Sequence, residues 1–394
     1  MKSTHSFPRR TYSFIIISLA YFVFAAYLFN KFGVKIMNDS PRYLAYASDL
    51  NEGFHFDPLN FWYFTYVFFI FLHQLFSDHL LPIIMSQYLL GYLAVLSLYA
   101  TTRIITENEV ISTLSSMLFI LFPDNIFWHS YILTESLYSS LLCFAFLFAI
   151  RYMKAKSHKN LVLLIFSVVL CFFCRPTSPA LVFALIMPFC IKFLSYPSYR
   201  IAKITALFII LVGVLALANE MISMHRVMLI YEKGDIIFAM HQVPNSPFHD
   251  LLRVAPPADL YLPENEKELI LAMLEFVVNN PLYWLKLFVS KLILYVTHIR
   301  PYWSWGHIIA VILIIWPSVF FGFSAVKKRL VHKPLLIPFL TYFLVHLLIV
   351  CNTWVDWDAR FFTPLFPVLA LLAAIGLHHE YEKFIKPWFI KTHI

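Results

Sequence analysis

The chain has 394 residues, of which 60% are hydrophobic, 18% aromatic and only 13% charged, and its formal net charge is +8. No water-soluble domain needs so large an apolar fraction, so the composition indicates an integral membrane protein. The excess of Lys and Arg does not indicate nucleic-acid binding, because these residues stand in short clusters between apolar runs, as they do in cytoplasmic loops.

The first apolar run, Tyr12 to Phe32, is long enough to cross a bilayer core of about 30 Å. The basic residues Lys2, Arg9 and Arg10 precede it, and it lacks a small-residue cleavage site. The pattern therefore predicts a signal anchor with a cytoplasmic amino terminus.

A polar loop over residues 33–79 follows and contains the acids Asp39 and Asp57. Its aromatic segment 61–76 is short for a span and is interrupted by polar residues. We expect this segment to form a juxtamembrane helix at the membrane interface, where aromatic rings are favoured.

Lys and Arg clusters set the remaining crossings, because basic loops stay on the cytoplasmic side. The loops predicted to be inside are 101–108, 151–159, 192–203 and 327–333, together with the basic C-terminal tail. The further predicted spans are 80–100, 110–122, 135–151, 161–173, 179–191, 201–218, 308–326, 335–351 and 361–377. The sequence thus predicts about ten spans with both termini cytoplasmic.

The apolar segment 281–299 is predicted to lie at the interface, because a crossing there would move the basic loop 327–333 outside. Its residues Lys286 and Lys291 are expected to snorkel or to attract anionic lipid. Residues 264–278 are predicted to form an amphipathic helix.

Three regions follow from this topology. Residues 1–219 are predicted to form an N-terminal transmembrane catalytic module that includes the outer loop 33–79. Residues 220–305 are predicted to form an outer loop region with an interfacial helix. Residues 306–394 are predicted to form the C-terminal spans and the cytoplasmic tail. The five cysteines lie within or at the ends of apolar runs, so no disulfide framework is predicted.

Many of the remaining polar residues fall on one side in this topology. The outer set is Asp39, Asp57, His129, Glu135, Arg175, Arg300, Asp356, Asp358 and Arg360. Ionised residues at a membrane edge usually pair and mark a pathway or a site. Carboxylates can act as general bases, and arginines hold phosphate through forked hydrogen bonds, so the set suits transfer of a group from a phosphate carrier.

Five segments resemble the GT-C superfamily of glycosyltransferases, in particular the protein O-mannosyltransferase and aminoarabinose transferase group. They are N-D-S-P-R-Y-L (38–44), F-D-P-L-N-F-W-Y (56–63), F-P-D-N-I-F-W-H-S-Y-I-L-T-E-S-L-Y (122–138), R-P-T-S-P-A (175–180) and D-A-R-F-F-T-P-L-F-P-V-L-A-L-L-A-A-I-G-L (358–377). The resemblance covers about residues 1–219 and 300–380, and the region 219–281 matches nothing in it.

The resemblance implies an all-α polytopic membrane protein, a GT-C-like helical bundle with juxtamembrane helices in the first outer loop and a small outer-face loop region. It implies inverting transfer of a sugar from a polyprenyl-phosphate carrier to a hydroxyl of a lipid, glycan or protein acceptor on the non-cytoplasmic face, in a bacterial inner membrane. Asp39 falls on the position of the catalytic base. Asp57 and Glu135 would orient the sugar or a metal, and Arg175 and Arg360 would hold the lipid phosphate.

Two positions depart from the group: a single Pro58 stands where a Pro-Pro pair is common, and Glu135 stands where Asp is common. His129 is a further candidate for substrate binding. A divalent cation between Asp39 and another outer acid stays open, although no His or Cys spacing indicates zinc.

Each candidate also has a structural explanation. Asp39 and Glu135 could cap helices, Asp57 could make a turn before Pro58, Arg175 could anchor at the interface, His129 could belong to an aromatic belt, and Asp356, Asp358 and Arg360 could pair with one another. Two other functions stay open as well. One is a transporter or flippase for a lipid-linked sugar, and the other is an O-antigen polymerase or ligase that uses a diphosphate donor.

Overall fold

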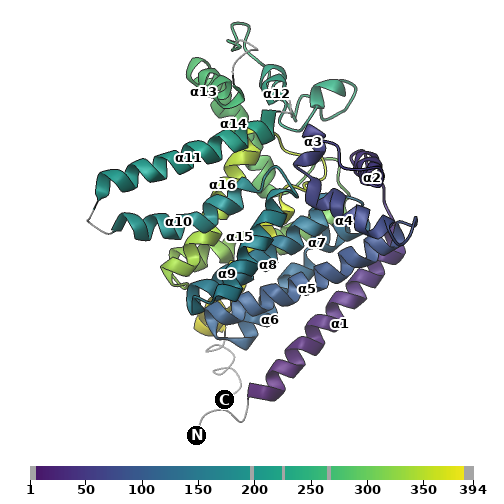
Figure 1. The fold of residues 1–394 in the computed structure, drawn as a ribbon, viewed down its shortest axis with the longest axis vertical. Helices are drawn as coiled ribbons and strands as arrows, with labels where there is room; N and C mark the ends of the chain where they lie inside the picture. Colours follow the sequence, from purple (N-terminus) through teal and green to yellow (C-terminus); the bar gives the residue numbers. More distant parts are fainter. Residues whose placement is uncertain (1–5, 196–198, 224–226, 264–267, 386–394) are drawn as a thin grey trace. The chain divides into compact units, whose positions relative to one another are not determined.

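The computed structural model describes residues 6–195, 199–223, 227–263 and 268–385 (Figure 1). Every regular element within these residues is helical, and β-structure is limited to three isolated bridges. The all-α fold class predicted from the sequence is therefore confirmed for the described residues.

The chain divides into two compact units, each built from separate stretches of sequence. Unit 1 comprises residues 1–175, 310–339 and 363–394, and unit 2 comprises residues 176–309 and 340–362. The three-part division expected from topology is a different kind of description, and it stays a prediction.

The helices of unit 1 are α1 (Ser6–Phe32), α2 (Ser40–Asp49), α3 (Pro58–Phe61), α4 (Phe64–Gln74), α5 (Leu81–Thr106), α6 (Glu109–Leu121), α7 (Pro123–Phe127), α8 (Thr134–Ala155), α9 (His158–Phe172) and α17 (Phe366–Glu380). Short 3₁₀ turns precede α8 and α17, at Trp128–Ser130 and Thr363–Leu365. Helix α8 packs between α5 and α9, and α17 packs on α6. Helices α1, α5 and α6 run beside one another in Figure 1.

The helices of unit 2 are α10 (Pro179–Ser195), α11 (Arg200–Ser223), α12 (Val227–Lys233), α13 (Leu269–Asn279) and α14 (Pro281–Thr297), with a 3₁₀ turn at Met240–Gln242. The long helices α15 (Trp305–Lys327) and α16 (Lys333–Asn352) pass from one unit into the other. Val227, Tyr231, Phe276 and Tyr283 form a buried core that joins α12, α13 and α14.

Among the described residues, six helices are long and apolar enough to cross a membrane, which fits the predicted integral membrane protein. They are Arg10–Phe32, Leu81–Thr106, Thr134–Ala155, Trp305–Lys327, Lys333–Asn352 and Thr363–Lys383. The bent pair Glu109–Leu121 and Asp124–Ser130, with an angle of 60°, would make a seventh span.

Three further expected crossings coincide with shorter apolar helices: His158–Phe172, Pro179–Ser195 and Ile201–Leu217. The first two, α9 with 15 residues and α10 with 17, cover about 23–26 Å, which is less than a bilayer core of about 30 Å. The stretch Ile201–Leu217 is the apolar part of the longer helix α11 and is not among the six candidate spans. The predicted count of about ten spans is therefore not confirmed.

The bend between α6 and α7 has a cause in the sequence. Pro123 has no N–H to continue the ladder of α6 and displaces the preceding residue from helical geometry. Phe122 is accordingly extended, with φ −68° and ψ 104°. The break allows the chain to turn through Trp128–Ser130 before α8 begins.

The predicted helices outside the spans are present. The segment 61–76 contains α4, and the segment 281–299 contains α14, which is not among the candidate spans. The predicted helix 264–278 corresponds to α13, although residues 264–267 lie outside the described residues.

The expectation that both lysines of α14 snorkel is wrong for one of them. Lys286 is exposed, but Lys291 is fully buried and donates a hydrogen bond from Nζ to the carbonyl oxygen of Thr353 at 2.6 Å. The faces of α14 therefore differ, because one packs into the core of unit 2 and the other remains accessible.

Candidate active site

The loop after α1 is fixed against the segment that leads into α8. The backbone N–H of Lys35 donates to the carbonyl of Ser130 at 2.8 Å, and the N–H of Ile132 donates to the carbonyl of Lys35 at 3.0 Å. The buried hydroxyl of Ser40 donates to the carbonyl of Ile132 at 2.9 Å. Asp39, next to Ser40 in the chain, is thereby held beside the start of α8.

Asp39 occupies the N-cap position of α2, but its side chain makes no capping hydrogen bond to that helix. The residue has helical backbone angles, φ −80° and ψ −23°, and it is half-buried. Helix capping therefore does not explain this carboxylate.

Glu135 and Arg175 form a buried ion pair. Oε1 of Glu135 lies 3.1 Å from Nη2 of Arg175, and the two side chains are only 2% and 3% exposed. Glu135 lies in the first turn of α8, where negative charge is favoured by the helix dipole. The burial of Arg175 excludes the alternative that it anchors the chain at an accessible interface.

Tyr43 of α2 connects the two acids electrostatically. Burial is the largest cause that raises its pKa well above the ordinary value, and its neighbour Tyr63 adds to this. Negative charge on Asp39 and on Glu135 raises the pKa further, so both carboxylates lie within electrostatic range of one phenol. The phenol of Tyr43 remains protonated and can donate a hydrogen bond.

Tyr66 of α4 lies next to Tyr43, with ring centroids 5.4 Å apart. Burial and then the charge of Glu135 raise the pKa of Tyr66 as well. Its hydroxyl donates to Oε1 of Gln87 at 2.9 Å, and Gln87 Nε2 donates to the carbonyl of His129 at 2.9 Å. This chain of hydrogen bonds ties α4 and α5 to the turn before α8.

Asp57 has a structural role at the start of α3, next to Pro58. Its Oδ1 accepts the backbone N–H of Asn60 at 2.8 Å and caps α3, and its Oδ2 accepts the Asn60 amide at 3.2 Å. Asn60 Oδ1 in turn accepts a hydrogen bond from Arg42 at 2.7 Å. The predicted contact of Asp57 with sugar or metal stays a prediction, and the geometry shows an indirect role in placing Arg42.

Arg42 is the residue that the sequence analysis missed. Its guanidinium carbon lies 4.6 Å from the ring centre of Tyr43 and 4.9 Å from that of Tyr63. It stands three residues after Asp39 on the first turns of α2, which places a cation beside the acid. That spacing was the signal that could have identified it.

His129 lies in the interior of unit 1, with 2% exposure. Within the described part of the chain, neither ring nitrogen has a hydrogen-bond partner. The ring packs edge-on to Tyr88 and against the backbone of Gly91, where an added Cβ would lie 2.0 Å from Nε2. This placement differs from an interfacial aromatic belt, and substrate binding by His129 stays a prediction.

Arg360 belongs to unit 2. The carboxylate of Asp356 accepts the backbone N–H groups of Arg360 and Phe361 at 2.6 and 3.3 Å. The fully buried Arg300 donates from Nη2 to the carbonyl of Asp356 at 3.1 Å. These contacts shape the loop around Asp356, and the predicted role of Arg360 toward a lipid phosphate is untested.

No group of three or more His, Cys, Asp or Glu side chains is arranged to hold a metal ion in the described ranges. Asp39 and Glu135 both act electrostatically on Tyr43, and Glu135 is already paired with Arg175.

No protein-family model matches the sequence, and no curated protein matches it. Among solved structures, the chain is similar to the oligosaccharyltransferase AglB from the archaeon Archaeoglobus fulgidus, in complex with an inhibitory peptide and a dolichol-phosphate. The TM-score is 0.49 and the identity is 12%, over 97% of this chain and 52% of that protein. This chain therefore spans about half the length of AglB, and a likeness at this level assigns neither a family nor an activity.

Proposed function

We propose that the protein is a membrane glycosyltransferase of the GT-C type. It would move a sugar from a polyprenyl-phosphate carrier to a hydroxyl acceptor on the non-cytoplasmic face, with inversion, and Asp39 would be the general base. The observation that carries the proposal is the docking of the Asp39 loop, through Ser40 and Ile132, beside the buried Glu135–Arg175 pair.

In the proposed reaction, Asp39 takes the proton of the acceptor hydroxyl while the acceptor oxygen bonds to the anomeric carbon. The bond between that carbon and the carrier phosphate breaks at the same time, and the phosphate leaves with the bonding electrons. A carboxylate that does not cap its own helix suits this role. The proton remains on Asp39 until it exchanges with water.

Arg175 and Arg42 are the proposed cations for the leaving phosphate. A guanidinium offers several N–H donors in one plane, which matches phosphate oxygens. Glu135 holds Arg175 in a fixed orientation, and the phosphate would compete with Glu135 for it. Asp57 and Asn60 would position Arg42, and Arg360 is a further candidate from unit 2.

The proposed orientation puts Asp39 on the periplasmic side of a bacterial inner membrane, with about ten crossings and both termini cytoplasmic. The candidate span Arg10–Phe32 supports such a separation, since its ends are about 33 Å apart at 1.5 Å per residue. Lipid, glycan and protein hydroxyls all remain possible acceptors. A divalent cation is not required by the proposed steps.

The test compares Asp39→Asn with Asp49→Asn in purified full-length protein supplied with a polyprenyl-monophosphate sugar. Asp49 is the exposed last residue of α2, so its change removes the same charge from the same helix. Loss of a general base should slow transfer by about 10²–10⁴-fold in Asp39→Asn, while Asp49→Asn keeps the rate. Equal rates in the two variants would remove Asp39 from the mechanism.

A transporter for a lipid-linked sugar is the second candidate. The bent pair α6–α7, with its 60° angle, favours it, because broken helices build many transporter sites. Sealed vesicles that contain the protein and a labelled carrier without any acceptor separate the two functions: a transporter moves the label across, and a transferase does not. A parallel comparison of mono- and diphosphate carriers tests the polymerase or ligase alternative.

A further inference from the structure

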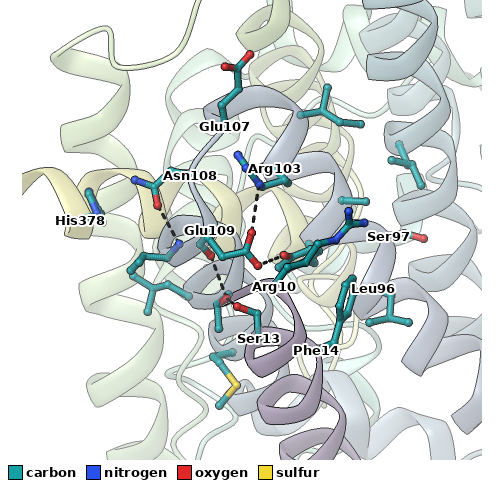
Figure 2. A pocket seen from close by; sticks show the side chains of 18 of the residues that line it. Arg10, Ser13, Phe14, Leu96, Ser97, Arg103, Glu107, Asn108, Glu109 and His378 are labelled. Carbon is teal, nitrogen blue, oxygen red and sulfur yellow. Dashed lines mark hydrogen bonds and ion pairs between the residues drawn. The ribbon is translucent and has the colours of Figure 1, made fainter. Parts of the chain in front are cut away.

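Unit 1 contains a cavity of about 2410 Å³ beside Arg10 and the end of α5 (Figure 2). Helices α1, α5, α6 and α8 and the residues around the end of α17 line it. None of the sequence-predicted site residues lines this cavity.

The cavity collects segments that the charge pattern places inside the cell. Its lining includes Arg10 ahead of the first span, Arg103 and Glu107 in the first inner loop, Arg151 at the end of α8, and Glu382 after the last span. These segments are far apart in sequence, and the structure brings them to one place.

The cavity lies at the opposite end of α8 from the candidate active site. Glu135 is in the first turn of α8 and Arg151 is near its end. They are sixteen positions apart in the helix, or about 24 Å along its axis. The cavity is therefore a separate feature from the Asp39 cluster.

Two acids at the mouth are already neutralised. Glu109 lies 3.3 Å from Nε of Arg103 and accepts a hydrogen bond from the Tyr99 hydroxyl. Figure 2 shows the ion pair between Arg103 and Glu109 as a dashed line. Glu107 lies 3.7 Å from Nζ of Lys154.

Arg10 and Arg151 provide the uncompensated charge. Both are exposed lining residues, and neither has an acidic partner within the residues that the structure describes. The remaining acid of the lining, Glu382, is exposed and is followed directly by Lys383. The lining thus has three arginines and three glutamates, and Lys154 and Lys383, which lie next to the lining, bring the local sum to five cations and three acids.

The inner wall is apolar. Phe14 from α1, Leu93 and Leu96 from α5, and Leu147 and Phe148 from α8 line it. Contact with apolar side chains does not stabilise a soluble anion, whereas it stabilises the acyl chains of a lipid by removing them from water. Cationic pockets between helices on the cytoplasmic side attract anionic lipid headgroups.

We propose that this cavity binds an anionic phospholipid of the cytoplasmic leaflet. The phosphodiester contacts Arg10 and Arg151, and the acyl chains lie along Phe14, Leu96 and Leu147. The proposal is independent of the sugar-transfer function, because the lipid sits at the other end of the helices and takes no part in the reaction.

The experiment measures lipid binding to delipidated full-length protein in detergent by native mass spectrometry, with phosphatidylglycerol and phosphatidylcholine as probes. The wild type should retain phosphatidylglycerol in preference to phosphatidylcholine. Arg10→Gln/Arg151→Gln should bind phosphatidylglycerol at least about tenfold more weakly. The control Lys31→Gln/Lys159→Gln removes the same charge from exposed positions outside the lining and should bind as the wild type does.

Two further arms make the result decisive. Leu96→Trp fills the wall and keeps both arginines, so it should also weaken phosphatidylglycerol binding. Soluble glycerol phosphate should not compete. Equal binding of the two lipids by all variants would overturn the proposal in favour of a non-specific lipid belt. Competition by glycerol phosphate would overturn it in favour of a site for a soluble anion.

Discussion

Breaking the Glu135–Arg175 pair should destabilise unit 1 strongly. The two charged atoms are 3.1 Å apart, and the side chains are 2% and 3% exposed. The change Glu135→Gln leaves the guanidinium buried without its counter-charge, which typically costs about 3–5 kcal/mol. For a domain of about 150–250 residues this corresponds to a melting temperature lower by roughly 6–20 °C.

The double variant Glu135→Gln/Arg175→Gln should be less unstable than the sum of the single variants. It removes both charges together, so no uncompensated ion stays buried, and a coupling of about 1–3 kcal/mol is expected. Thermal unfolding in detergent, followed by tryptophan fluorescence, measures all three variants against the wild type.

Glu107→Gln is the matched control. Glu107 also pairs with a basic residue, Lys154 at 3.7 Å, but its side chain is 81% exposed. Exposed pairs contribute little, so this change should leave the melting temperature close to that of the wild type. The reasoning is refuted if the two buried-pair changes are additive, or if Glu107→Gln lowers the melting temperature as much as Glu135→Gln does.

Three other predictions concern stability. Asp57→Ala should destabilise by about 1 kcal/mol because it removes the cap of α3, as measured by thermal unfolding. Gly91→Ala should cost about 1–3 kcal/mol because its Cβ would lie 2.0 Å from Nε2 of His129, and thermal unfolding of Gly91→Ala/His129→Ala should recover part of that loss. Burial lowers the pKa of Lys291 from 10.5 to about 7. Between these values the unfolded chain binds a proton that the folded chain does not, so the melting temperature should rise from pH 7 toward pH 10, and Lys291→Met should remove that rise.

The distribution of Lys and Arg among the loops predicted part of the candidate site. It put Glu135 and Arg175 on the same side because basic loops elsewhere fix the topology, and the structure shows the two in direct contact. Their contact could not be derived from sidedness alone, because it depends on where α8 begins relative to the turn after α9. The docking of Ser40 on Ile132 is likewise a tertiary contact without a sequence signature.

Local patterns were ambiguous where one residue type serves two purposes. An Asp before Pro is common both in turns and in sites, and the contacts of Asp57 with Asn60 show its role as a cap. Hydropathy predicted an apolar helix over 281–299, and the charge rule favoured an interfacial position for it, which stays a prediction. Neither pattern could tell which lysine faces the core. Lys291 is buried because that face of α14 packs on residues near Thr353.

The number of crossings was the least determined feature. Hydropathy detects apolar stretches, whereas a crossing also needs sufficient continuous helix. The helix at the expected span 110–122 has only 13 residues and ends before Pro123, and α9 ends after Phe172 with 15 residues. Arg42 was not among the predicted site residues, because that prediction was based on the acids of the loop. The cation lies about one helical turn after Asp39.

The most direct test of the proposed function measures donor affinity and single-turnover transfer rate on the same Asp39→Asn protein. If Asp39 is the base, the variant should bind the polyprenyl-monophosphate sugar as tightly as the wild type but transfer it about 10²–10⁴-fold more slowly. An unchanged transfer rate with intact donor binding would contradict the account.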